Sequence, residues 1–83
     1  MTREFRGAFA SLPNDIQRQA QRAYRLFRTD PRYPSLRFKK VDEVSNVYSV
    51  RIGLGYRALG VVEGAIVVWF WIGSHGDCDR LLG

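Results

Sequence analysis

The stretch that decides the fold runs from Val47 to Ile72 and reads VYSVRIGLGYRALGVVEGAIVVWFWI. Its first part alternates apolar residues with others, which is typical of a half-buried strand. Two glycine-containing breaks, GLG at 53–55 and EG at 63–64, divide it into three runs. Breaks of this length connect neighbouring antiparallel strands, so strands are predicted at 47–52, 56–62 and 65–72. The last run is apolar on both faces, which favours a central strand or one covered on both sides.

Two helices and a fourth strand are predicted before this stretch. Residues 13–29 carry apolar side chains at spacings of three and four, which form one helical stripe. The stripe consists of Ile16, Ala20, Ala23 and Phe27. A shorter helix is expected over residues 4–10, and the alternation in residues 36–39, Leu-Arg-Phe-Lys, predicts a strand. The expected fold is α+β, with N-terminal helices packed on an antiparallel sheet of about four strands.

Length and composition exclude several classes of protein. A chain of 83 residues is expected to form a single domain over 1–83, and its 46% hydrophobic content is too high for a disordered tail. One cysteine, Cys78, and one histidine, His75, cannot make a disulfide or a structural zinc site, so no metal or other cofactor is expected. The longest apolar run is too short to span a membrane, and no signal peptide is recognised. We therefore expect a cytoplasmic protein with no membrane partner.

The positive charge is concentrated in the first half of the chain. The formal net charge is +5; residues 1–40 carry ten bases and three acids, whereas residues 41–83 carry three bases and five acids. Because a guanidinium group binds phosphate bidentately and keeps its charge, the arginine-rich half favours a phosphate-bearing partner. A solubilising helix face is at least as good an explanation of the charge alone. The arginines opposite the helical stripe are Arg18, Arg22 and Arg25.

Two arginines flank the first hairpin loop. If Gly53-Leu54-Gly55 is a three-residue loop, Arg51 lies directly opposite Arg57, and like charges in that position repel each other. An anion bound between the two side chains would offset the repulsion. If the turn has two residues instead, the register shifts and the arginines become ordinary surface charges on opposite faces. The spacing alone leaves both interpretations open.

His75 follows the last predicted strand, in the segment Gly73-Ser74-His75-Gly76-Asp77-Cys78-Asp79. Histidine suits proton transfer near neutral pH, but an isolated histidine after a strand is more often a turn residue. The segment also has the residue types of a metal cluster, a weak signal without a second histidine or another cysteine in the chain.

The order of short motifs along the chain adds to this picture. The motifs are Leu12-Pro13, Phe27, Asp30-Pro31, Pro34-Ser35-Leu36, Phe38-Lys39-Lys40, Tyr48-Ser49-Val50-Arg51-Ile52, Tyr56-Arg57-Ala58, Trp69-Phe70-Trp71-Ile72-Gly73 and His75. In this order they resemble the RelE/ParE superfamily of toxins from type II toxin–antitoxin systems, with a RelE/HigB-like character. The resemblance runs from about Phe5 to the C-terminus.

The resemblance implies a compact toxin that an antitoxin, expected to be acidic, holds inactive. RelE-like members cleave messenger RNA, usually in the ribosomal A site. By similarity, Arg51 and Arg57 are candidates for stabilising the charge that develops at the phosphate, and His75 is the candidate acid or base. Attack by the 2′-hydroxyl of the RNA itself requires no metal. Candidates for holding the RNA backbone through a salt-sensitive attraction are Arg37, Lys39 and Lys40, together with Arg18, Arg22 and Arg25.

Departures from the family pattern keep other interpretations open. Cys78 stands where relatives commonly have a tyrosine, Ser49 stands where the best-known RelE toxin has a lysine, and residues 1–9 read as a helix instead of a first strand. The alternatives to a ribosome-dependent mRNA endoribonuclease are a ParE-like gyrase inhibitor and a non-toxic, catalytically degenerate binding member. Because the two faces of residues 65–72 cannot both meet the predicted helices, one apolar face is expected to meet the antitoxin or a second copy of the chain.

Overall fold

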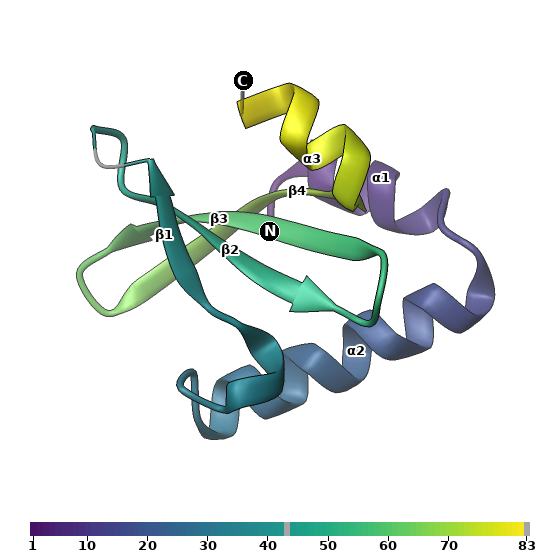
Figure 1. Ribbon diagram of the computed structural model, residues 1–83, viewed down its shortest axis with the longest axis horizontal. Coiled ribbons are helices and arrows are strands. Elements are labelled where there is room, and N and C mark those ends of the chain that lie inside the picture. Colours follow the sequence, from purple (N-terminus) through teal and green to yellow (C-terminus); the bar gives the residue numbers. More distant parts are fainter. Residues whose placement is uncertain (43, 83) are drawn as a thin grey trace.

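The computed structural model describes residues 1–42 and 44–82. The elements along these residues are α1 (Arg3–Ala10), α2 (Asn14–Thr29), the 3₁₀ turn η1 (Pro34–Leu36), β1 (Lys39–Asp42), β2 (Val47–Ile52), β3 (Tyr56–Glu63), β4 (Ile66–Ser74) and α3 (His75–Leu82). Figure 1 shows α2 lying alongside the sheet and α3 following directly from β4. The predicted α+β fold, with N-terminal helices on a four-stranded antiparallel sheet, is confirmed.

The sheet is an antiparallel meander in chain order, so β1 and β4 lie at its two edges. Of the two placements predicted for the apolar run at 65–72, the central strand is therefore wrong, and the strand covered on both faces is confirmed. Helix α1 packs along β4, and the amide N–H of Thr2 donates to the carbonyl of Trp69 at 3.0 Å. The N-terminus thus protects part of an apolar edge that would otherwise be open to pairing with another chain.

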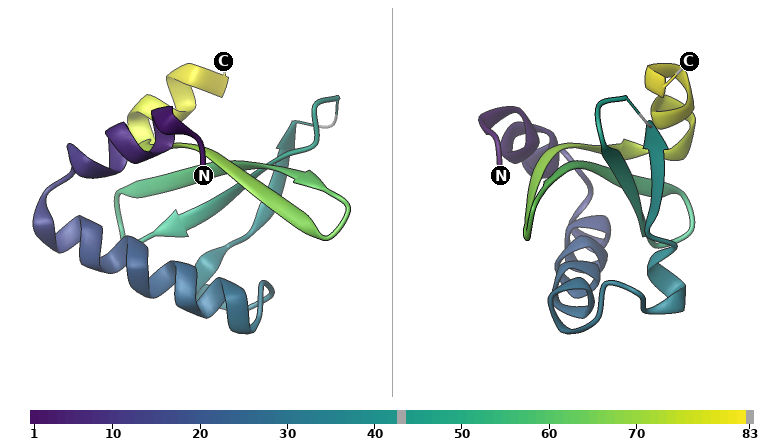
Figure 2. Two further views of the ribbon diagram at one scale, coloured as in Figure 1. Left: turned by 180° about the vertical axis from the view of Figure 1, so that it is seen from behind. Right: turned by 90° about the vertical axis from the view of Figure 1, so that its left-hand side faces the viewer.

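Helices cover both faces of the sheet, as the end-on view in Figure 2 shows. Phe5 of α1 and Ala20 and Ala23 of α2 are buried against the first face. Their buried partners on the sheet are Val50, Ile52, Ala58, Trp69 and Ile72. On the second face, Cys78 of α3 is buried against Val47 and Leu59. The molecule therefore has two apolar layers, a larger one under α1 and α2 and a smaller one under α3.

A bulge in β4 explains how this strand is apolar on both sides. Leu59 pairs with Trp71 and Gly60 pairs with Trp69, which leaves Phe70 without a partner on β3. Trp69 belongs to the layer under α1 and α2, whereas Phe70 and Trp71 both belong to the layer under α3. The premise that only one face of this strand meets helices is therefore wrong, because α3, which the sequence did not predict, packs on the second face.

Two predicted boundaries also differ from the structure. The strand expected over residues 36–39 begins only at Lys39, because Pro34–Leu36 forms a 3₁₀ turn that ends at Arg37 with a left-handed φ of 46°. Leu36 contributes to the strand-like alternation of apolar residues in the sequence. In the structure its side chain lies in the 3₁₀ turn and is buried in the core. The second hairpin turn lies one residue later than predicted, because Glu63 pairs with Ile66.

Among residues 1–42 and 44–82, no helix combines the length and the apolar character that crossing a membrane requires.

Candidate functional site on the second face of the sheet

The β2–β3 hairpin places two arginines opposite each other. Arg51 pairs with Arg57 in the antiparallel register, so the three-residue loop is confirmed and the two-residue alternative is wrong. Because side chains alternate between faces, Ser49 lies on the same face, and Lys39 of β1 pairs with Ser49. Three cationic side chains therefore start from the sheet face that α3 partly covers.

Arg57 is bonded at two points of its guanidinium group. Its Nε donates to Nδ1 of His75 at 2.9 Å, and its Nη1 donates to the hydroxyl oxygen of Ser49 at 2.9 Å. Ser49 is only 1% exposed, so this bond provides a partner for a buried hydroxyl. Two contacts on one planar group fix its orientation, and three of the five N–H groups of Arg57 remain outside these two bonds.

His75 is the first residue of α3 and links Arg57 to a carboxylate. Its Nε2 lies 3.3 Å from Oδ2 of Asp79, one helical turn further on. Because Nδ1 accepts the hydrogen bond from Arg57, the imidazole proton belongs on Nε2, facing Asp79. The side chains of His75 and Asp79 are 51% and 68% exposed, so both are within reach of a ligand in solution.

Local features at the start of α3 set the position of His75. The amide of Asp77 donates to the Ser74 hydroxyl at 3.1 Å, a helix N-cap. The guanidinium of Arg80 and the hydroxyl of Ser74 hold the pKa of the Asp77 carboxyl below its usual range. Burial raises the pKa of the Cys78 thiol, and the nearby charges of Arg57 and Lys39 oppose this effect. Cys78 therefore anchors α3 to the sheet as a neutral apolar side chain.

The histidine–cysteine–aspartate segment does not gather around one point. Cys78 faces the sheet, whereas His75 and Asp79 face each other on the exposed side of α3. Within the part of the chain that the structure describes, no group of three histidine, cysteine, aspartate or glutamate side chains is placed to hold a metal ion.

Arg51 and Arg57 diverge although they are paired. The Nε of Arg51 donates to the carbonyl oxygen of Gly53 at 2.9 Å, toward the hairpin loop. Arg57 instead reaches Ser49, in the opposite direction along β2. Their repulsion is thus relieved by separation, and the two guanidinium groups do not form one clamp.

The residues predicted to hold RNA are distributed over different surfaces. Lys39 lies beside Ser49 on the site face, whereas Lys40 pairs with Tyr48 and starts from the other face. Arg37 is exposed just before β1. The remaining three, Arg18, Arg22 and Arg25, are exposed along α2. Of these three, Arg22 lines a cavity of about 360 Å³ together with Arg51.

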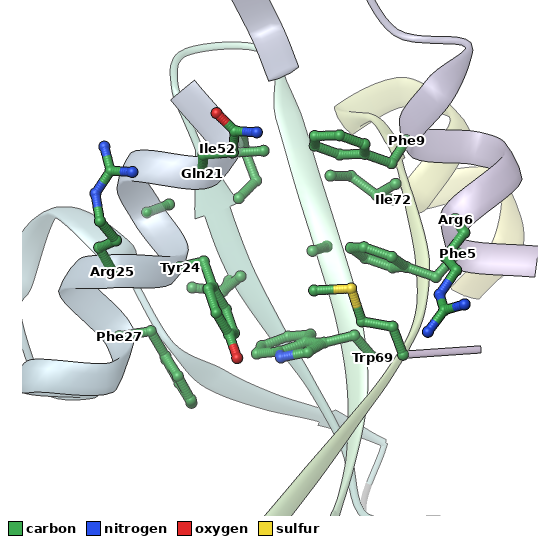
Figure 3. A pocket seen from close by; sticks show the side chains of 15 residues that line it. Phe5, Arg6, Phe9, Gln21, Tyr24, Arg25, Phe27, Ile52, Trp69 and Ile72 are labelled. Carbon is green, nitrogen blue, oxygen red and sulfur yellow. The ribbon is translucent and has the colours of Figure 1, made fainter. Parts of the chain in front are cut away.

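A larger concavity lies on the first face, between α1 and α2. Its volume is about 520 Å³, and we call it the α1–α2 pocket. Figure 3 shows aromatic side chains from both helices over the sheet, with Arg25 pointing away from the pocket on the α2 side and Arg6 lying beside it on the α1 side. Residues that line the pocket include Met1, Phe5, Phe9, Tyr24, Phe27 and Trp69. Such an apolar hollow with cationic margins suits a partner that is apolar at its centre and acidic around it.

Sequence reasoning missed α3 and the contact of Asp79 with His75. The signal was present, because Ser74 and Asp77 stand three residues apart in the pattern of a capping box. With a helix beginning there, the spacing of four between His75 and Asp79 places both on one side of it.

Comparisons with known proteins agree with this fold. The sequence profile of the ParE-like toxin domain matches residues 14–79, a range that contains the whole sheet, both arginines and His75. The structure is similar to a chain in the crystal structure of a RelB–RelE antitoxin–toxin complex from Methanococcus jannaschii. The TM-score is 0.77 at 16% sequence identity, over 99% of this chain and 96% of the other. No curated protein sequence matches the chain.

Proposed function

The chain belongs to the ParE-like toxin family, and on this premise we propose that it is a toxin that cleaves messenger RNA during translation on the ribosome. The observation that carries the proposal is the orientation of Arg57, whose guanidinium is bonded to both Ser49 and His75. A fixed cation beside an exposed imidazole is the pair of groups that RNA cleavage through the 2′-hydroxyl requires.

The proposed reaction uses these contacts. The 2′-oxygen of the RNA attacks the adjacent phosphorus, the bond from phosphorus to the 5′-oxygen breaks, and a cyclic phosphate forms. A phosphate bound to Arg57 competes with His75 for the Nε–H donor, and its binding releases Nδ1. The free Nδ1 then takes the proton of the 2′-hydroxyl, while the leaving 5′-oxygen takes a proton from water. Asp79 keeps the other imidazole proton on Nε2 throughout.

Arg57 has the larger energetic role in this scheme. Charge accumulates on the phosphate oxygens in the transition state, and a cation already in place stabilises that charge without reorganising. Removing one such donor typically slows a reaction by about 100- to 1000-fold. Arg57→Ala is therefore expected to abolish growth arrest when the toxin is induced.

The test is to induce the wild type, Arg57→Ala and His75→Ala while mapping transcript 5′ ends. Arg32→Ala is the matched control, because Arg32 is exposed in the turn after α2, away from the site. We expect new 5′ ends in the wild type and in Arg32→Ala, and their loss in the other two variants. Unchanged cleavage in Arg57→Ala would overturn the catalytic assignment.

The family match itself favours a second candidate function, inhibition of DNA gyrase, because the matching profile is that of ParE-like toxins. This function requires binding and no RNA cleavage. A supercoiling assay with purified toxin separates the two: inhibition of gyrase without new transcript ends would favour the ParE-like function. Toxin that neither cleaves RNA nor inhibits gyrase would be a binding member that has lost its activity.

The antitoxin is proposed to be an acidic protein that places an amphipathic helix in the α1–α2 pocket. The solved structure that this chain resembles is an antitoxin–toxin complex, which supports a protein partner of that kind. The apolar lining and the two flanking arginines, Arg6 and Arg25, support an apolar helix face bordered by carboxylates. The charge of the chain, +5, favours association with an acidic partner.

A further inference from the structure

The two edges of the sheet differ in how well they are protected against pairing with another strand. Edge strand β1 has four residues, of which Lys39, Lys40 and Asp42 are charged, and its register shifts between Lys40 and Asp42. Short length, charge and a bulge all discourage pairing from edge to edge. Edge strand β4 has nine residues, IVVWFWIGS, with no charge and no proline. The outer edge of β4 is therefore the one that a further strand can join.

The N-terminal segment covers this outer edge at Trp69. Because the Trp69 carbonyl accepts from the amide of Thr2, it points away from β3. Backbone groups of every second residue point to the same side of an antiparallel strand, so the amide and the carbonyl of Val67 also point outward. Among the described residues, no backbone bond from a turn, a loop or a helix end reaches Val67. The left-hand view of Figure 2 shows β4, in bright green, continuing past the N-terminus to the turn that joins it to β3.

The free part of the edge is short and apolar on both faces of the sheet. Val67 packs toward the layer under α1 and α2, whereas Val68 pairs with Val61 of the layer under α3. Ile66 starts from the same face as Val68 and is 65% exposed. The β3–β4 turn ends this segment on one side, and the bond from Thr2 ends it on the other. An added strand therefore has room to pair over residues 66–68.

These limits fit a second copy of the same segment. When two copies meet in antiparallel orientation about a two-fold axis at Val67, each Val67 amide donates to the Val67 carbonyl of the other copy. Ile66 of each copy then lies opposite Val68 of the other, so apolar side chains meet on both faces. No charged residue of β4 lies at the axis. A longer strand from an unrelated protein would run into the N-terminal segment at Thr2.

From this fit we infer that the outer edge of β4 is a self-pairing surface through which two copies of the chain join their sheets into one. The surface is the edge of the sheet and not one of its faces, both of which are packed against helices. Because the paired segment is short, the dimer is weak and forms only at high concentration. The inference does not depend on the proposed ribonuclease function.

The experiment is sedimentation velocity of the purified full chain over a wide range of concentrations. The weight-average mass of the wild type is expected to rise from one copy toward two. Ile66→Lys places two ammonium groups diagonally across the axis on one face, and is expected to weaken association by at least about tenfold. The new lysine lies opposite Glu63 at an exposed position, so this variant is expected to fold.

The matched control is Leu54→Lys, which makes the same change of charge at another exposed apolar residue. Leu54 lies in the β2–β3 loop, at the other end of β3 from the β3–β4 turn, so this variant is expected to associate like the wild type. A second variant, Val67→Pro, removes the outward amide without removing a hydrogen bond inside the sheet, and is expected to stay monomeric.

Amide hydrogen exchange locates the contact. In the wild type, exchange at the Val67 amide is expected to slow as concentration rises, while exchange at the Leu54 amide stays the same. A mass that remains that of one copy at every concentration would overturn the inference, as would equal association of the wild type and Ile66→Lys. Protection of the Val67 amide only after addition of the antitoxin would overturn it too, because the edge would then hold an antitoxin strand.

Discussion

Arg57 depends on a buried neighbour for its orientation. The Ser49 hydroxyl accepts from Nη1 at 2.9 Å and is itself shielded from water. In Ser49→Ala this acceptor is lost, and a hydrogen bond of this kind contributes about 0.5–1.5 kcal/mol. We expect cleavage to slow by about two- to tenfold, with the loss in kcat and not in KM. Ser11→Ala, at an exposed serine bonded to Gly7 of its own helix, is the control. An unchanged kcat would show that Ser49 does not position Arg57.

In the proposed mechanism, Asp79 acts on the reaction through His75. Its carboxylate lies 3.3 Å from Nε2 and favours the imidazole proton there, which leaves Nδ1 free of a proton for the proposed mechanism. Asp79→Asn is expected to slow cleavage by about tenfold in the wild-type background and to have no effect when combined with His75→Ala. A merely structural role would lower activity in both backgrounds. An equal loss in the two backgrounds would therefore contradict the positioning role.

Helix α3 is the element that completes the site, and its attachment depends on Cys78. Burial raises the pKa of this thiol, so the folded state disfavours the thiolate. The stabilising contribution of the neutral thiol is complete below the ordinary thiol pKa of about 8.5 and is lost as the pH rises through the higher pKa of the folded state.

We therefore predict that unfolding free energy falls more steeply above about pH 9 in the wild type than in Cys78→Ala. Cys78→Ala is expected to be less stable at neutral pH by about 1–2 kcal/mol, because it leaves a small cavity under α3. Urea unfolding of both proteins at several pH values measures the difference. Parallel pH dependences would show that the thiol does not titrate differently in the folded and unfolded states.

The elements that the sequence predicted well are those in which one periodicity dominates. The apolar stripe of α2 and the alternation of β2 predicted the helix and the strand, whereas the register that pairs Arg51 with Arg57 was one of two that the spacing left open. The bulge at Phe70 was not predictable, because it depends on the close packing of the Trp69 ring at Gly60, where a Cβ would lie 2.8 Å from a ring carbon.

The candidate site was predictable only in part. Arg57 and His75 were chosen from residue type and family resemblance, and the structure brings them together at 2.9 Å. The divergence of the Arg51 side chain from Arg57 was not predictable. Strand register determines the face from which a side chain starts, but not the direction in which a long arginine side chain extends. The contact between Asp79 and His75 was not predicted, because the segment after β4 reads as a loop. Residues four apart come into contact only when the segment is helical.

At the scale of the whole molecule, the two proposed partners use opposite faces of the sheet. The proposed Arg57–His75 site lies on the α3 side of the sheet, whereas the α1–α2 pocket lies on the other side. A helix seated in that pocket alone does not touch Arg57. Binding of the antitoxin and cleavage of RNA by the free toxin should therefore respond to different substitutions.

Charge reversal on α1 tests this separation. Arg6 borders the α1–α2 pocket and Arg3, on the same helix, does not line it. Because a cation at the rim of an interface typically contributes less than about 1 kcal/mol, Arg6→Glu is expected to weaken antitoxin binding by about three- to tenfold, and Arg3→Glu by less than about twofold. Titration calorimetry with the purified antitoxin gives the affinities, and transcript 5′-end mapping should show wild-type cleavage in both variants. Equal losses of affinity in the two variants would point to long-range attraction by the net charge, and would place the antitoxin elsewhere on the molecule.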